Sequence, residues 1–315
     1  MDETGARWAV ILAGGDGVRL RSLTRELTGD DRPKQFCPVL GRDTLLDQTR
    51  RRVARAVSPF RTLLVVTRHH ERFYAPVAAA LPPHCVVAQP ENRGTAPAIL
   101  YALLRVAALA PAATVAIFPS DHYISDDGVF MAHVEDGFAA VAARPDLLVL
   151  LGITPDRPEV EYGWIEPDVP VAGLGELSGA LSSVNRIWEK PSAALADTLR
   201  ARGSLWNSFV MVGRVETFLG LIGDAVPGLA TPFAAVSEDV GTPRETDAVR
   251  VLYAGLPATD FSRQVLAARP AQLAVLPVAG VGWNDLGDPQ RVRASRVAEA
   301  RRRSARVGTL AVAHG

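Results

Sequence analysis

Cysteine and lysine are scarce in this chain of 315 residues, which contains two of each. The two cysteines, Cys37 and Cys85, are too few for the disulfide framework of a small secreted protein or for a cysteine-rich zinc site. We expect both to be buried, unreactive thiols. The N-terminus also lacks the basic and apolar leader of a secreted protein. A cytoplasmic location is therefore expected.

The chain has neither an excess of charge of one sign nor a long hydrophobic run. Lysine plus arginine and aspartate plus glutamate number 34 each, which argues against general binding to nucleic acid. The longest apolar stretch, residues 98–118, is interrupted by Arg105 and Pro111. A membrane-spanning helix needs about 20 consecutive apolar residues. We therefore expect no nucleic-acid partner and no membrane span.

The two lysines stand out against the arginines. Of the 34 cationic residues, 32 are arginine, and lysine occurs only at Lys34 and Lys190. A chain that uses arginine almost everywhere keeps lysine where a compact point charge is needed. Both positions are therefore candidates for function.

Short apolar runs alternate with amphipathic segments over the first half of the chain. The runs predict buried strands at residues 8–13, 62–67, 85–88, 114–118 and 147–153. Helices are expected between them, at residues 44–57, 70–81, 95–110 and 128–143. The alternation predicts an α/β fold with a Rossmann-like, mixed and mostly parallel sheet flanked by helices.

The second half of the chain is less regular. Residues 155–170 are rich in proline and acidic side chains and residues 173–179 in glycine, so we expect excursions from the sheet that form a lid over a substrate. Strands are expected at residues 184–188 and 209–212, and helices at residues 216–222 and 244–253. The arginine-rich residues 291–306 favour a solvated helix face. We divide the chain into a catalytic domain, residues 1–290, and a basic C-terminal helix or tail, residues 291–315.

A glycine-rich loop, residues 14–17, follows the first apolar run. Glycines allow the backbone to approach an anion closely, and backbone amides can bind phosphate oxygens. The loop is not a dinucleotide fingerprint, because Leu20 stands where a third glycine or alanine is required, and neither lysine follows a glycine as in a P-loop. Arg19 and Lys34 add cations near the same strand end. Together these features indicate a phosphate-binding site.

The motifs LAGGDGVRL (residues 12–20) and RPKQF (residues 32–36) resemble those of the sugar-1-phosphate nucleotidyltransferases, and the PKQF form resembles the mannose-1-phosphate guanylyltransferases among them. Further motifs follow in the family's order: QPENRGTAPA at 89–98, FPSDH at 118–122, EYGWIE at 161–166, WEKP at 188–191, WNS at 206–208, DFS at 260–262 and GWNDLG at 282–287. One motif would be weak evidence, but the ordered set is specific.

The resemblance implies a role for each matching position. The residues that would bind the nucleotide are Leu12, Ala13, Gly14, Gly15, Gly17, Gln89, Gly94 and Thr95. Arg19 would hold the triphosphate, and Lys34 would stabilise charge on the α-phosphate. Asp121 and Asp285 would bind Mg²⁺ as the cofactor. The residues that would face the sugar phosphate are Gly163, Glu166, Glu189, Lys190 and Asn207.

The implied reaction is transfer of a nucleotidyl group from GTP to mannose 1-phosphate, which gives GDP-mannose and pyrophosphate by in-line attack. GTP and a sugar 1-phosphate are then the expected partners. The sequence leaves open whether the chain forms a homodimer. We expect a short form without the isomerase domain of some relatives. The alternatives are another sugar 1-phosphate such as a heptose, another nucleoside triphosphate, or a catalytically silent regulatory subunit that binds a sugar nucleotide.

One residue departs from the family's pattern, and one pair of histidines has no role that the resemblance assigns. Phe209 follows Trp-Asn-Ser where the family has glycine, which would narrow the surroundings of the sugar. His69 and His70 are interpreted as the start of a surface helix.

Overall fold

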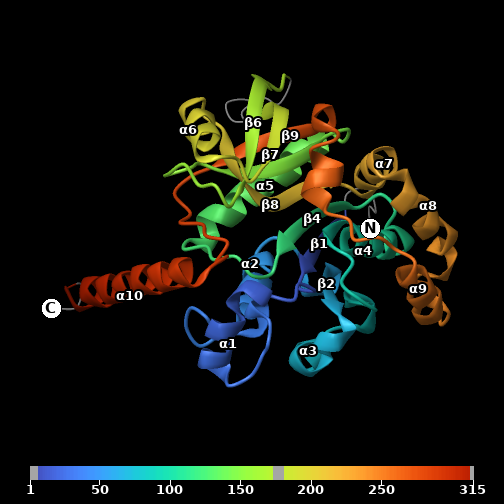
Figure 1. The fold of residues 1–315 in the computed structure, drawn as a ribbon, viewed down its shortest axis with the longest axis horizontal. Coiled ribbons are helices and arrows are strands. Elements are labelled where there is room, and N and C mark those ends of the chain that lie inside the picture. The colour runs from blue at the N-terminus through green and yellow to red at the C-terminus, as the bar shows by residue number, and fades with distance from the viewer. Residues whose placement is uncertain (1–5, 173–180, 313–315) are drawn as a thin grey trace.

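The apolar runs of the first half form the parallel part of one nine-stranded sheet in the computed structural model, which describes residues 6–172 and 181–312 (Figure 1). The strand order is β3-β2-β1-β4-β8-β5-β9-β7-β6. The strands are β1 (Arg7–Leu12), β2 (Thr62–Thr67), β3 (Val86–Gln89), β4 (Thr114–Pro119), β5 (Leu148–Ile153), β6 (Gly163–Pro170), β7 (Ser182–Glu189), β8 (Leu205–Arg214) and β9 (Leu273–Val278).

The helices cover both faces of this sheet. They are α1 (Arg21–Thr28), α2 (Leu45–Val53), α3 (Glu71–Ala78), α4 (Thr95–Leu109), α5 (Asp127–Ala143), α6 (Ala193–Ala201), α7 (Val215–Ala225), α8 (Pro227–Ala235), α9 (Glu245–Ala254) and α10 (Pro289–Val312). Helices α4, α7, α8 and α9 share one hydrophobic core with Trp8 and Val10 of β1. Helices α2, α3, α5 and α6 share the other core with Ala9 and Ile11. Because successive side chains of a strand point to opposite faces and both faces are covered, β1 is apolar from Trp8 to Leu12.

Parallel pairing brings several loops to one edge of the sheet. Leu12 at the end of β1 pairs with Val65 of β2 and Pro119 of β4. Gln89, at the end of β3, pairs with Thr67 at the end of β2. The carboxyl ends of these strands therefore lie together, where open α/β sheets place their ligands.

The second half of the chain is more regular than its sequence indicated. Residues 163–170, expected as part of an excursion, form β6, which pairs antiparallel with β7 and with β8. Trp164 and Ile165 are fully buried and fix this strand in the core. Pro167 and Pro170 argued against a strand. Both lie at register shifts of β6, at the end of the sheet, where a missing backbone N–H is tolerated. The glycine-rich residues 173–179 lie outside the described residues.

The expected α/β class with a mixed sheet flanked by helices is confirmed. Parallel pairing is confined to β3-β2-β1-β4 and to β5 with β9, whereas β8, β7 and β6 pair antiparallel. The arginine-rich residues 291–306 lie within α10, which extends away from the rest of the molecule (Figure 1). Among the residues described, no helix has both the length and the apolar character needed to cross a membrane.

Candidate functional site

Two cavities lie at the carboxyl edge of the parallel strands. The first, of about 300 Å³, is lined by residues that include Leu12, Gly14, Gly15, Gln89, Gly94, Thr95 and Asp121. The second, of about 270 Å³, is lined by residues that include Gly17, Arg19, Lys34 and Asp121. Asp121 belongs to both linings, so the two cavities are neighbours. All the nucleotide and phosphate residues expected from the sequence line one of the two, except Ala13, which is buried beside them.

The glycine-rich loop is held in place by a side chain that the sequence-based assignments did not include. The Gln35 side-chain amide donates hydrogen bonds to the carbonyl oxygens of Ala13 (2.9 Å) and Gly15 (2.8 Å). Gly17 has φ +60°, and a Cβ there would lie 3.1 Å from the backbone nitrogen of Lys34. The loop therefore requires glycine at this position and packs directly on the RPKQF segment. The feature of the sequence that could have pointed to Gln35 is its place in the RPKQF motif.

Lys34 connects three segments that are distant in sequence. Its side chain is 11% exposed, and its Nζ lies 3.3 Å from Oδ2 of Asp121. The same ammonium donates hydrogen bonds to the carbonyl oxygens of Asp285 (2.6 Å) and Leu286 (3.2 Å). Lys34 thus joins the loops that follow β4 and β9. A backbone bridge between Tyr123 and Asn284 joins the same two loops.

Asp121 and Asp285 are the two carboxylates expected to bind Mg²⁺; Asp121 lines both cavities, whereas Asp285 lines neither and lies next to Leu286, which lines the second. Burial alone would raise the pKa of the Asp121 carboxyl, but the charges of Lys34 and His122 outweigh burial and lower it. Asp121 is therefore ionised at neutral pH. Oδ1 of Asp285 accepts hydrogen bonds from the backbone N–H of Gly287 (2.8 Å) and from Nη1 of Arg291 (3.0 Å). Carboxylate oxygens are the donors that Mg²⁺ prefers, and both aspartates contact Lys34, Asp121 through its carboxylate and Asp285 through its carbonyl oxygen.

The residues expected to face a sugar phosphate form a second group around β6 and β7. Gly163 pairs with Glu189 across the two strands. A Cβ at Gly163 would lie 2.8 Å from Oε1 of Glu189, so only glycine fits without displacing that carboxylate. Burial and the neighbouring Asp260 raise the pKa of the Glu189 carboxyl. Oε2 of Glu166 accepts a hydrogen bond from Nε1 of Trp188 (3.1 Å).

Glu161 links this group to the phosphate loop. Nζ of Lys190 lies 3.3 Å and Nη1 of Arg19 lies 4.0 Å from the same oxygen, Oε2 of Glu161. Within the described residues, Gly163, Glu166, Glu189, Lys190 and Asn207 line neither of the two cavities. The structure therefore brings the two predicted groups together through Arg19, Glu161 and Lys190 and not through a shared cavity wall. Glu161 was quoted in EYGWIE but was given no role.

Phe209 occupies an unusual backbone position at the cavity. Its φ is +58°, a conformation that favours glycine, and its ring lines the cavity that also contains Gly14, Gln89 and Asp260. The ring packs edge-on against Phe261, with centroids 6.2 Å apart. The backbone N–H of Phe209 donates to Oδ1 of Asn207 (2.9 Å), which holds the turn.

Comparison with known proteins agrees with this geometry. Residues 8–295 match the model of the nucleotidyl transferase family. The chain belongs to this family. The xanthan biosynthesis protein XanB of Xanthomonas campestris pv. campestris is 33% identical over 285 residues, which are 88% of this chain and 57% of that protein. A mannose-1-phosphate guanylyltransferase of Klebsiella pneumoniae is 29% identical over 223 residues, 70% of this chain and 45% of that protein. The chain thus spans about half the length of these curated relatives.

A solved structure supports the same assignment to the nucleotidyl transferase family. The crystal structure of a protein named mannose-1-phosphate geranyltransferase, from Thermus thermophilus, is 30% identical to this chain, with a TM-score of 0.75. The alignment covers 89% of this chain and 76% of that one. The family indicated by the ordered motifs is therefore confirmed.

Proposed function

We propose that residues 1–290 of this nucleotidyl transferase family member catalyse transfer of the guanylyl group from GTP to mannose 1-phosphate, releasing pyrophosphate. The observation that carries the proposal is the meeting of the glycine-rich loop, Lys34 and Asp121 at the carboxyl edge of the sheet. A relative named mannose-1-phosphate guanylyltransferase supports the choice of nucleotide and sugar.

The residues of the site suit a reaction in which little covalent work falls to the protein. An oxygen of the sugar phosphate attacks the α-phosphorus in line, the bond to the bridging oxygen breaks, and pyrophosphate leaves on the opposite side. Arg19 binds phosphate oxygens near the loop, and Lys34 neutralises charge that develops on the α-phosphate. Asp121 and Asp285 would hold Mg²⁺, which neutralises phosphate charge when bound.

The sugar side depends on the second group of residues. Lys190 has a side chain that is 47% exposed, so its ammonium can exchange Glu161 for a phosphate group. Glu189, Glu166 and Asn207 can accept or donate hydrogen bonds to sugar hydroxyls. Binding of both substrates would place anions beside Arg19 and Lys190, and this would release Glu161 from the two cations.

A screen of substrates tests the proposed reaction. We expect GTP with mannose 1-phosphate to give the fastest pyrophosphate release among four nucleoside triphosphates and a panel of sugar 1-phosphates. EDTA should abolish turnover, and added Mg²⁺ should restore it, because the phosphate charges then lose and regain their divalent cation. A clear preference for UTP or dTTP would contradict the guanylyl assignment. Binding without turnover for every pair would favour a regulatory subunit.

The second candidate function, transfer to another sugar 1-phosphate, is favoured by Phe209, which lines the nucleotide cavity and whose backbone N–H binds Asn207 of the sugar-phosphate group. Phe209→Gly removes the ring and suits the positive φ, so we expect the cavity to widen, with relief of backbone strain offsetting part of the stability lost with the ring. The ratio of kcat/KM for a heptose 1-phosphate to that for mannose 1-phosphate should rise by about tenfold, the effect of added room in a pocket. Phe209→Ala is the control, because it removes the ring but keeps the strained backbone. An unchanged ratio in both variants would place Phe209 away from the sugar.

A further inference from the structure

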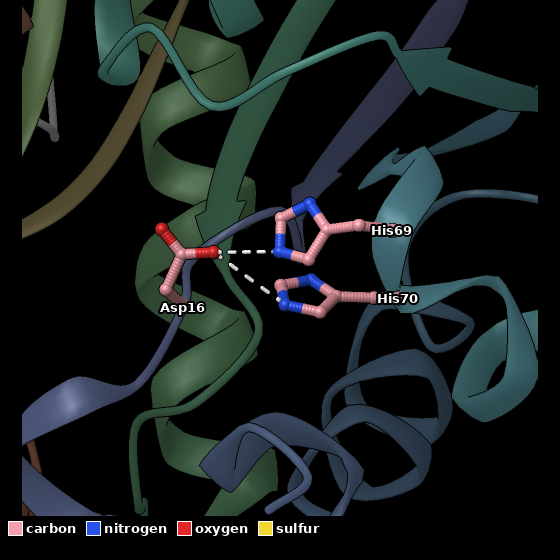
Figure 2. A group of neighbouring side chains, drawn as sticks. All are labelled: Asp16, His69 and His70. Carbon is pink, nitrogen blue, oxygen red and sulfur yellow. Dashed lines mark hydrogen bonds and ion pairs between the residues drawn. The ribbon is translucent and has the colours of Figure 1, made fainter.

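We propose that Asp16, His69 and His70 form a binding site for a divalent transition-metal ion such as Zn²⁺, separate from the aspartates assigned to Mg²⁺. Asp16 belongs to the glycine-rich loop after β1, and the two histidines end the short 3₁₀ helix Arg68–His70 after β2. Figure 2 shows both imidazole rings pointing toward the Asp16 carboxylate. Among the residues that the structure describes, this is the one group of three or more histidine, cysteine or carboxylate side chains whose ligand atoms lie within 4.8 Å of one another.

The distances in this cluster suit a tetrahedral metal. Nε2 of His69 lies 2.9 Å and Nε2 of His70 lies 3.5 Å from the same oxygen, Oδ1 of Asp16. Bonds of about 2.0–2.2 Å from Zn²⁺ to nitrogen and oxygen place tetrahedral ligand atoms about 3.3 Å apart. The two measured separations fall on either side of this value. All three ligand atoms lie within 4.8 Å of one another, so adjustment of the side chains would bring them to the separation that the ion requires.

His70 is the buried member of this cluster. Its side chain is only 6% exposed, and within the described part of the chain its buried Nδ1 has no hydrogen-bond partner. The ring nitrogen that faces Asp16 is Nε2, so Nε2 is the atom that His70 would offer to a metal. A buried histidine beside a carboxylate contradicts the expectation that both histidines simply start a surface helix; only His69 is exposed.

Asn92 supplies an outer contact of the kind that metal sites use. Its Nδ2 donates a hydrogen bond to Oδ2 of Asp16 (2.9 Å), which leaves Oδ1 directed at the two histidines. Such partners orient a metal-binding carboxylate. With three protein ligands, one tetrahedral position stays open for water or another ligand, as in zinc sites that are not purely structural.

The cluster lies against the wall of the cavity assigned to the nucleotide. Gly14, Gly15 and Asn92 line that cavity, and Oδ1 of Asn92 accepts a hydrogen bond from the backbone N–H of Gly94 (3.0 Å). An ion bound by Asp16 would fix the glycine-rich loop to the loop after β2, and through Asn92 to residue 94. Metal binding itself is independent of the proposed reaction, whereas an effect on GTP affinity rests on it.

Direct titration with metal tests the site without reference to activity. Full-length protein is freed of metal with EDTA, dialysed, and titrated with Zn²⁺ by calorimetry and with Co²⁺ by visible absorption, in a constant excess of Mg²⁺ to occupy hard oxygen sites. We expect one saturable site per chain and Co²⁺ bands in the visible range that Zn²⁺ removes. His69→Ala, at a side chain that is 54% exposed, should fold normally and weaken Zn²⁺ affinity by at least about tenfold.

Further variants separate a metal site from a structural cluster. His70→Gln and Asp16→Asn should weaken binding in the same way, with folding checked by circular dichroism. His133→Ala is the matched control, because His133 also faces a carboxylate, that of Asp136 at 3.8 Å, but belongs to no such cluster among the described residues. Absence of a saturable site, or affinity that is equal in wild type, His69→Ala and His70→Gln, would overturn the proposal. Zn²⁺ binding that leaves GTP affinity unchanged would disprove the coupling to the nucleotide cavity while leaving the metal site in place.

Discussion

Replacing Lys34 with methionine is expected to lower kcat by about 10²-fold or more, because the ammonium would neutralise charge that grows on the α-phosphate in the transition state. Methionine keeps most of the aliphatic stem of this largely buried side chain. The substitution also leaves the carbonyl oxygens of Asp285 and Leu286 without their donor, at a cost of about 1–3 kcal/mol of stability. Pyrophosphate release at saturating substrate measures the rate, and thermal unfolding measures the stability.

Two comparisons make the Lys34 experiment specific. Lys34→Arg should also be impaired, since a planar guanidinium does not replace a compact ammonium that contacts Asp121 and two carbonyl groups. Arg144→Met, at an exposed ion pair with Asp146, removes a cation far from the cavities and should leave kcat unchanged. Near-normal turnover in folded Lys34→Met would show that Lys34 does not act on the reacting phosphate.

Removing the charge of either candidate metal-binding aspartate is expected to have an effect of similar size. Asp121→Asn and Asp285→Asn should each lose about 10²-fold or more in kcat, because the remaining carboxylate would hold Mg²⁺ poorly and the ion's stabilisation of charge would be lost. The double variant should be hardly slower than either single variant, since two ligands of one ion act as a unit. Rates measured over a range of Mg²⁺ concentrations test this directly.

The aspartates also have structural contacts, which the controls must address. Asp285 is paired with Arg291, and Asp121 with Lys34, so thermal unfolding of each variant is needed beside its rate. Asp146→Asn serves as the surface control. If the two losses multiply independently, or if one single variant keeps wild-type turnover at low Mg²⁺, the aspartates do not share an ion.

The fold was predictable from sequence where one physical signal dominated. Strand β2 has the predicted bounds because its residues are apolar on both faces and are followed at once by polar ones. Strand β6 was missed because Pro167 and Pro170 usually exclude a strand, and the burial of Trp164 that overrides them depends on its antiparallel partners. Helix α8 was missed for a similar reason: Pro227 starts it and Pro232 lies inside it.

The candidate site was predictable as far as its motifs reached. Lys34, Asp121 and Asp285 were proposed from RPKQF, FPSDH and GWNDLG, and the structure places them around one ammonium group. The contact of Asp16 with His69 joins positions 53 residues apart, and no spacing in the sequence encodes it. Such a contact arises only because the ends of the paired strands β1 and β2 are adjacent.

The hydrogen bond from Lys34 to the carbonyl oxygen of Asp285 spans 251 residues, and this has a consequence for synthesis of the chain on the ribosome. The strands β1 to β4 are complete after residue 119, so all four are synthesised long before β9. Asp121, one partner of the Lys34 ammonium, follows β4 directly, whereas the two carbonyl partners, at Asp285 and Leu286, emerge only after β9. A nascent chain can therefore form the sheet edge and the contact of Lys34 with Asp121 long before the two carbonyl contacts, and the full set of Lys34 contacts is among the last features to be completed.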